Sequence, residues 1–150
     1  MVIFVENEIL EFLLKAKKST YAGKGSEAAP CRPGSHDFVF REGDFLYYDS
    51  YLGGDRFSGE EALWIGDQPD WSMNYAGRVL DESFSGAFLK EALGNVPREK
   101  PFRGPEYYAA GDYAYRCGVS GSAEWFQGFE TISFQDKPVY ECRFHGGSLC

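Results

Sequence analysis

The hydrophobic and polar positions of the first 35 residues predict one amphipathic helix followed by a long loop. Apolar side chains recur at the helical spacing i, i+3, i+4 and i+7, at Ile9, Phe12, Leu13 and Ala16. We therefore expect a helix over residues 7–18, with Asn7 as its N-cap. Residues 19–35 are rich in glycine, proline and serine. They predict either a surface loop that ties the helix to the sheet or a lid over a site.

Alternating apolar and polar residues then predict a series of strands. The first four expected strands are joined as two hairpins by turns at 42–43 and 67–70, and they cover residues 37–41, 44–51, 61–66 and 71–79. A second helix is expected to begin at Ser83 or Ser85 and to end at Gly94. Residues 107–145 predict a three-stranded meander with turns at 120–121 and 135–137. No internal repeat is expected.

Together these patterns predict a single domain over residues 1–150, of the α+β class. We expect a twisted antiparallel sheet of six to seven strands with two main helices. A pocket is expected between the concave face of the sheet and the helix at 83–94. Within the strand at 71–79, Asn74 has the opposite parity to Trp71 and Tyr75. Both faces of this strand are therefore expected to be partly covered, one by the helix at 83–94 and the other by the N-terminal helix or the 19–35 loop.

The expected turns of the meander place one carboxylate on its inner face. The turn at 120–121 puts Tyr115 opposite Phe126, and the turn at 135–137 puts Glu130 opposite Cys142. Glu130 would then lie among aromatic side chains, where an unpaired charge is costly. It could reach solvent at the sheet edge, form a closed ion pair with Arg78 or Arg103, or form the base of a ligand pocket. We favour the ion pair.

A second carboxylate, Asp49, interrupts an aromatic stripe in the strand at 44–51. It shares one strand face with Phe45, Tyr47 and Tyr51. Two alternatives remain open: Asp49 lies near the strand end, where water enters, or it is a polar group of a pocket.

Composition and charge narrow the class of protein. The chain has 13 Phe, 10 Tyr and 3 Trp, with 43% hydrophobic and 25% charged residues, so it can bury a core. The net charge of −8 argues against nucleic-acid binding by this chain alone. We find no signal peptide and no apolar run long enough to span a membrane, and expect a cytoplasmic protein.

Candidate chemistry is sparse. The four cysteines, Cys31, Cys117, Cys142 and Cys150, lack a metal-binding spacing, and Cys117 and Cys142 are expected in the core. We predict reduced thiols, no metal and no cofactor. Neither histidine lies in a recognised nucleophile motif, so no catalytic residue is assigned. A small enzyme that uses Glu130 as an acid or base is the least favoured function.

Several segments together resemble a known family. They include FLYYDSYLGG (45–54), FSGEEALWIGDQPDWSMNYAGRVL (57–80), FLKEALGNVP (88–97), FRGPEYY (102–108) and WFQGFETISFQDKPVYECRFHGG (125–147). The set resembles an uncharacterised bacterial and archaeal domain of unknown function, over roughly residues 5–147. In some members this domain follows a repressor-type helix-turn-helix, which we do not expect in this chain. The resemblance implies an effector-sensing module and assigns no reaction.

We therefore predict a domain that binds an unknown small molecule, partly aromatic or cationic, in an aromatic-lined pocket. The candidate ligand-binding residues are Asp49, Tyr51, Asn74, Tyr75, Arg78, Arg103, Tyr113, Glu130, Tyr140 and His145. The alternative is a protein-interaction module that docks a partner through an exposed aromatic surface. No membrane partner is expected, and a homodimer is a further expectation.

Overall fold

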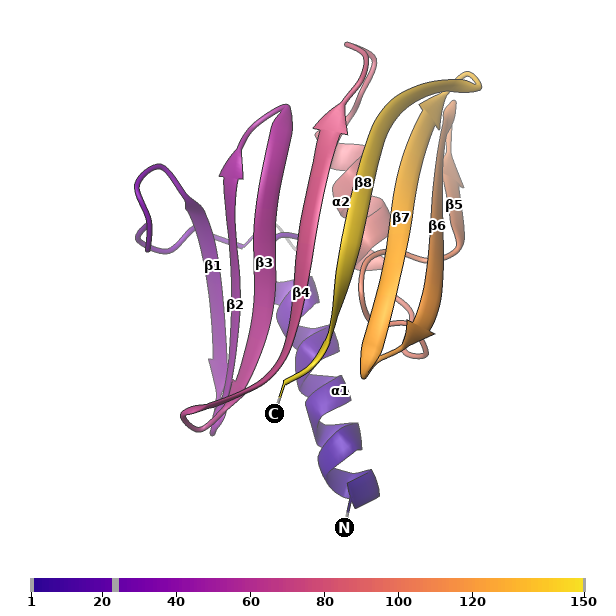
Figure 1. The fold of residues 1–150 in the computed structure, drawn as a ribbon. Helices are drawn as coiled ribbons and strands as arrows, with labels where there is room; N and C mark the ends of the chain where they lie inside the picture. Colours follow the sequence, from indigo (N-terminus) through magenta and orange to yellow (C-terminus); the bar gives the residue numbers. More distant parts are fainter. Residues whose placement is uncertain (1, 23–24, 150) are drawn as a thin grey trace.

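The computed structural model describes residues 2–22 and 25–149, with side chains from residue 7 onward within those ranges. Cys150 lies outside the described residues. The elements in chain order are α1 (Val2–Ser19), β1 (His36–Glu42), β2 (Phe45–Gly53), β3 (Arg56–Ile65), β4 (Gln68–Val79), α2 (Gly86–Gly94), β5 (Tyr107–Ala110), β6 (Tyr113–Ser122), β7 (Trp125–Phe134) and β8 (Lys137–Ser148). The strands form one antiparallel sheet in the order β1-β2-β3-β4-β8-β7-β6-β5 (Figure 1).

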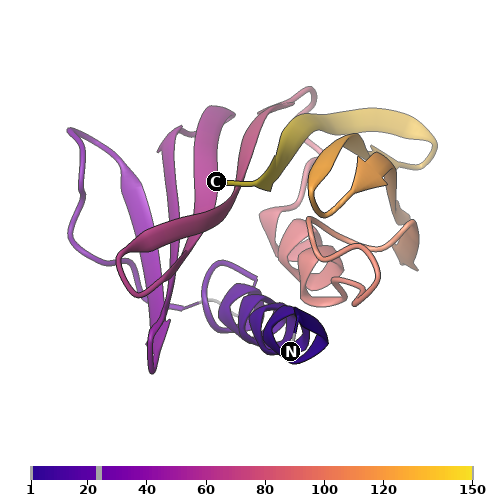
Figure 2. The ribbon, with the colours of Figure 1, turned by 60° about the horizontal axis from the view of Figure 1, so that its bottom comes forward.

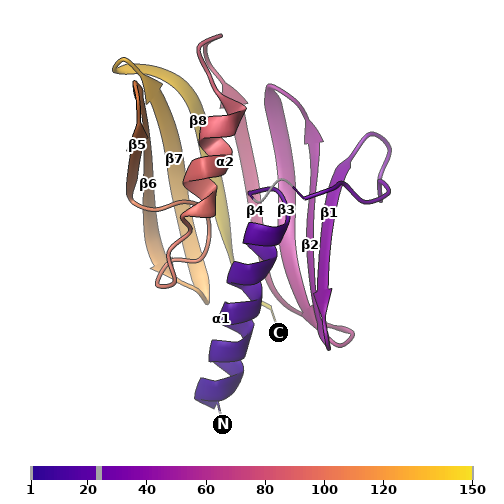
Figure 3. The same cartoon turned by 180° about the vertical axis from the view of Figure 1, so that it is seen from behind.

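Both helices lie against the same face of this curved sheet, which we call the concave face (Figures 2 and 3). Helix α1 buries Phe12, Leu13 and Ala16, as its apolar spacing predicts. Helix α2 buries Phe88, Leu89, Ala92 and Leu93. Ser85 caps α2, because its side-chain oxygen accepts a hydrogen bond from the Phe88 amide at 3.1 Å.

The fold is mostly β and differs from the prediction in its element count. The described residues form eight strands instead of six to seven, because Gly111 and Asp112 form a turn that separates β5 from β6. Strand β3 begins at Arg56, five residues before the predicted start. Helix α1 begins at Val2, so Asn7 is not its N-cap.

The prediction that no internal repeat exists is wrong. Each half of the chain is a helix followed by a four-stranded meander: α1 to β4 in the N-terminal half and α2 to β8 in the C-terminal half. The halves meet where β4 pairs with β8. In this pair Tyr75 lies opposite Phe144, Trp71 opposite Ser148 and Val79 opposite Tyr140. A shift of 69 residues maps this set of pairs onto itself, so an approximate two-fold axis passes between Tyr75 and Phe144.

Short sequence matches follow the same symmetry. Phe57-x-Gly59-x-Glu61 in β3 matches Phe126-x-Gly128-x-Glu130 in β7, and Asp67-x-Pro69-x-Trp71 matches Asp136-x-Pro138-x-Tyr140. The packing of the helices matches as well. Phe12 lies 5.1 Å from Phe45 and 5.7 Å from Phe40, and Phe88 lies 5.1 Å from Tyr113 and 5.7 Å from Tyr108, between ring centroids. The domain is therefore built from two copies of one structural unit.

Each half also buries one glutamate with one cation and one tyrosine. In the N-terminal half, Glu61 accepts hydrogen bonds from Tyr47 and, at 2.7 Å, from Lys17. In the C-terminal half, Glu130 accepts hydrogen bonds from Tyr115 and from Arg103, whose nitrogens lie 2.5 and 3.1 Å away. Tyr140 adds a third donor to Glu130 at 2.6 Å. We call these two groups the acid clusters.

The predicted strand register is confirmed in one hairpin and wrong in the other. Glu130 lies opposite Cys142, as expected. In the β6–β7 hairpin, however, the turn lies at residues 123–124, and Tyr115 faces Ile132 instead of Phe126. The error is an even number of residues, so each side chain keeps its predicted face. Glu130, Cys142 and Cys117 are accordingly buried on the concave face.

The expected covering of both faces of β4 is also wrong. Trp71, Met73 and Tyr75 are buried on the concave face, and both helices lie on that side (Figure 3). The opposite, convex face carries Asn74. Residues 28–35 contact this face at β1 and β2. Asp37 of β1 accepts hydrogen bonds from the Cys31 amide and the Ser35 hydroxyl, and the Arg32 guanidinium donates a hydrogen bond to the Ser50 hydroxyl of β2 at 2.6 Å.

Replacement of Glu130 tests the role of the C-terminal acid cluster. We expect Glu130→Gln to lower the free energy of unfolding by about 3–5 kcal/mol, because it leaves the buried Arg103 charge without a counter-ion. Urea denaturation measures the change. The exposed Glu99→Gln provides the control and should stay within about 0.5 kcal/mol of the wild type. Equal stability of the two variants would contradict this role.

Candidate functional site

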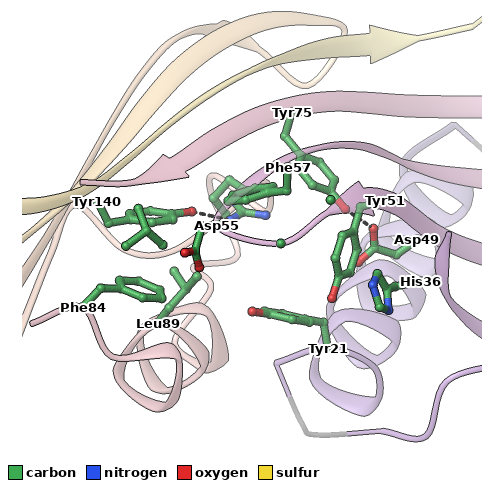
Figure 4. A pocket seen from close by; sticks show the side chains of 14 residues that line it. Tyr21, His36, Asp49, Tyr51, Asp55, Phe57, Tyr75, Phe84, Leu89 and Tyr140 are labelled. Carbon is green, nitrogen blue, oxygen red and sulfur yellow. Dashed lines mark hydrogen bonds between the residues drawn. The ribbon is translucent and has the colours of Figure 1, made fainter. Parts of the chain in front are cut away.

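The concave face contains a pocket of about 340 Å³ beside the two-fold axis (Figure 4). Its walls come from the loop after α1, from β1 to β4, from the start of α2, from the loop before β5 and from β8. The lining residues are Tyr21, His36, Asp49, Tyr51, Gly53, Gly54, Asp55, Phe57, Tyr75, Val79, Phe84, Leu89, Arg103 and Tyr140. The pocket thus lies between the sheet and α2, as predicted.

Flat rings form two opposing walls of this pocket. On one side, Tyr140 stacks on Phe57 at 6.2 Å and on Phe84 at 5.3 Å between ring centroids. On the other side, His36 stacks on Tyr51 at 4.8 Å, and Tyr21 meets Tyr51 edge to face. Such walls suit a planar or positively charged group.

The Gly53–Gly54 hairpin shapes the mouth of the pocket. Gly53 has a φ of +98°, and a Cβ atom there would lie 2.0 Å from the Arg56 carbonyl oxygen, so only glycine fits. The turn brings the exposed Asp55 carboxylate to the pocket rim and turns the chain so that Phe57 faces inward.

Asp49 is the buried carboxyl of the pocket. Its side chain is 6% exposed, and the Tyr75 hydroxyl donates a hydrogen bond to it at 2.5 Å. Burial, together with the nearby charge of Glu61, raises the pKa of Asp49 to about 7, against the opposing effects of Tyr75, Arg103 and Lys17. Asp49 therefore exchanges a proton near neutral pH. Asp49 is therefore a polar group of the pocket and does not lie at a solvated strand end.

The two buried cations near Asp49 are already neutralised. Lys17 pairs with Glu61, and Arg103 pairs with Glu130. The Arg103 guanidinium also lies 5.2 Å from the centroid of Tyr75. Among the described residues Asp49 takes part in no ion pair. When Asp49 is ionised, this group of buried side chains has three negative charges, on Asp49, Glu61 and Glu130, and two positive charges, on Lys17 and Arg103.

Glu130 belongs to the closed ion pair that the sequence favours, with Arg103 as its partner. The carboxylate is fully buried. Although burial opposes ionisation, the charge and hydrogen bonds of Arg103, with those of Tyr115 and Tyr140, lower the pKa of Glu130. A carboxylate held ionised and enclosed in this way is poorly suited to donate a proton to a ligand.

The structure brings half of the predicted ligand-binding residues to the pocket. Asp49, Tyr51, Tyr75, Arg103 and Tyr140 line it. Glu130 lies behind Arg103 and Tyr140 without lining the cavity.

The other predicted residues lie elsewhere. Tyr113 stacks on Phe88 and donates a hydrogen bond to the Ser83 carbonyl at 2.6 Å, so it supports α2. Asn74 and His145 lie opposite each other on the convex face. Arg78 is exposed and pairs with Glu141 at 3.2 Å. The last three have the parity of the convex face in β4 and β8, which excludes them from the concave pocket.

Sequence reasoning missed several lining residues, most clearly Tyr21, His36, Asp55 and Phe57. Tyr21 lies within residues 19–35, which were expected to be a loop or lid, and His36 directly follows them. The lid itself stays a prediction. The sequence does contain a signal for Phe57. It is an aromatic residue that follows the Gly53–Gly54 turn, and it has the same parity in β3 as Glu61, so the two side chains share one face of the strand.

The described residues contain no group of three or more His, Cys, Asp or Glu side chains that could hold a metal ion. Nor does any helix within them combine the length and the apolar character needed to cross a membrane.

Comparison with known proteins identifies a family and no characterised relative. The chain matches no curated protein and no solved structure. Residues 49–149 match the family model described as a domain of unknown function, DUF5680. This match covers most of the chain and includes strands that line the pocket from both halves. The chain therefore belongs to the DUF5680 family.

Proposed function

We propose that this domain binds a small organic cation in the concave pocket. The observation that carries the proposal is Asp49, a buried carboxyl in the pocket wall that has a tyrosine donor but no ion pair among the described residues. A buried carboxylate without a counter-ion is costly, and a bound cation would supply the missing charge. The aromatic walls attract cations in addition.

Charge outside the pocket supports the same ligand class. Asp55 adds a carboxylate at the rim, and the whole chain carries a net charge of −8, which attracts cations from solution. The positive charge of Arg103 does not cancel the negative charge of the pocket, because Arg103 is already paired with Glu130. The pocket volume of about 340 Å³ suits a molecule of one or two rings.

We infer a binding role for the pocket. The enclosed Glu130 is unsuited to proton transfer, which argues against an enzyme that uses Glu130 as its acid or base, and Asp49 is assigned to the bound cation. An effector-sensing role agrees with the resemblance to domains that follow a helix-turn-helix in other members. The cytoplasmic location, the absence of nucleic-acid binding and the homodimer stay predictions from the sequence.

A protein-interaction role is the second candidate, and exposed aromatic residues of the C-terminal half favour it. Tyr107, Trp125 and Phe129 are 57%, 84% and 45% exposed. They lie on the convex face, away from the pocket. A partner docked there would leave cation binding in the pocket unchanged, so the two functions can be tested separately.

Ligand binding tests the proposal directly. We expect benzyltrimethylammonium to raise the melting temperature of the wild type by several degrees at saturating concentration, and benzylsulfonate, an anion of similar shape, to have no effect. Asp49→Asn should abolish the shift, because it removes the negative charge. Asp67→Asn, in an exposed turn, is the matched control and should keep it. A shift that survives Asp49→Asn contradicts the proposal.

The pocket location has its own test. Val79 lines the pocket and Leu80, the next residue, is 42% exposed. We expect Val79→Trp to fill the cavity and prevent binding of the cation, whereas Leu80→Trp retains it. Isothermal titration calorimetry measures both. Binding by the Val79→Trp protein at wild-type affinity would place the site elsewhere.

Proton release should accompany binding. Below about pH 7 the Asp49 carboxyl is mostly protonated, so a cation must displace its proton. The affinity should fall by up to about tenfold for each pH unit below 7 and should level off above it. Titrations in buffers of different ionisation enthalpy measure the released proton. A pH-independent affinity in the wild type excludes Asp49 as the anchor.

Asp49 also affects stability in the absence of ligand. Its pKa is raised on folding from 3.8 to about 7, so the folded state binds the extra proton in this range. Its contribution to stability therefore falls as the pH rises from about 4 to about 7, by a total on the order of 4 kcal/mol. The stability difference between Asp49→Asn and the wild type, from denaturation at pH 4 and pH 8, should increase with pH. A constant difference contradicts the raised pKa.

A further inference from the structure

Three aromatic rings of the pocket have symmetry counterparts with the same geometry. Phe57 lies 6.2 Å from Tyr140 and 6.1 Å from Tyr75, with interplanar angles of 16° and 56°. Their counterparts are Phe126, Trp71 and Phe144. Phe126 lies 6.0 Å from Trp71 and 6.3 Å from Phe144, with angles of 16° and 53°. The two halves therefore present nearly the same aromatic surface on the concave face.

The two surfaces differ in what covers them. Phe102, from the loop after α2, stacks on Phe126 with ring centroids 3.9 Å apart and planes 13° apart. Phe126 is therefore buried, at 3% exposed. Among the described residues, no ring stacks on Phe57 at such a short distance, and Phe57 is half-buried and faces the pocket. The pocket wall in the N-terminal half thus lacks the ring that closes the C-terminal half.

We propose that the pocket takes a planar aromatic cation, whose ring stacks on Phe57 as Phe102 stacks on Phe126. This inference rests on the proposed function and names the class of ligand. Tyr75 and Tyr140 are already arranged around Phe57 in the geometry that accommodates a stacked ring. In the C-terminal half the equivalent rings surround Phe126, on which Phe102 stacks. Offset stacking between aromatic rings contributes affinity beyond the area that it buries.

The charge of the ligand follows from a second difference between the halves. Cys117 occupies the position in β6 that Asp49 occupies in β2, and Phe144 replaces Tyr75. The half that is closed by its own phenylalanine ring has an apolar pair at these positions. The open half has a carboxyl with its tyrosine donor. A ligand that replaces a ring such as that of Phe102 here must also provide a positive charge near Asp49.

The experiment compares two cations of equal charge and similar size. N-methylquinolinium is planar, and N,N-dimethyldecahydroquinolinium is its saturated, puckered analogue. Calorimetric titration of the wild type should give an affinity for the planar cation about five- to tenfold higher. Phe57→Leu should reduce this preference to near one, whereas Phe57→Tyr, which retains the ring, should keep it. Phe126→Leu is the matched control: it should lower the melting temperature but leave the preference intact.

The possible results separate the two proposals. If both cations bind through Asp49 with equal affinity, or if Phe57→Leu keeps the preference in a protein whose circular dichroism is unchanged, the ring-stacking inference is overturned while the proposed function stands. If neither cation binds, both are overturned. If Phe57→Leu does not fold, the ratio in the wild type and in Phe57→Tyr still decides, since a ratio near one in either protein overturns the inference.

Discussion

The buried glutamate of each half is the interaction on which the rest of this structure depends. Glu61 and Glu130 lie at equivalent positions of β3 and β7, and each needs a cation because the interior offers little solvation. The cations come from different places: Lys17 from the end of α1, and Arg103 from the loop after α2. By pairing with the sheet, they fix the helix end in one half and the connecting loop in the other. The pocket lies between these two fixed segments.

The two halves have diverged where the pocket lies. Their shared residues are those that shape the sheet: the glutamates, the glycines, the prolines after the hairpin turns and the large rings. Asp49 and Cys117 lie at equivalent positions of β2 and β6, and this difference changes the polarity of the concave face. A duplicated scaffold can therefore keep one copy as a packed core and open the other to solvent. In this domain the N-terminal copy is the open one.

Much of the architecture could be predicted from local patterns. The strands and α2 follow from alternation and capping, and the even register error in the β6–β7 hairpin did not move Glu130 from the core face. Local patterns do not determine which of Arg78 and Arg103 pairs with Glu130. Both were reasonable partners for Glu130, but strand parity sends Arg78 to the convex face, whereas Arg103 lies in a loop whose path depends on tertiary packing. The duplication was missed because matching residues are sparse and the spacing between copies changes from the helices to the strands.

The pairing of β4 with β8 has a consequence for how the chain reaches this state. These strands lie some 70 residues apart in sequence, and α2 and β5 to β7 are synthesised between them, so the central seam can form only after those elements have been made. Until then β4 is a twelve-residue edge strand with unpaired backbone groups. The β4 edge of one molecule can therefore accept β8 of another molecule in the register that its own β8 uses. An exchange of β8 between two molecules would form the same seam twice, which is the geometry of a domain-swapped dimer.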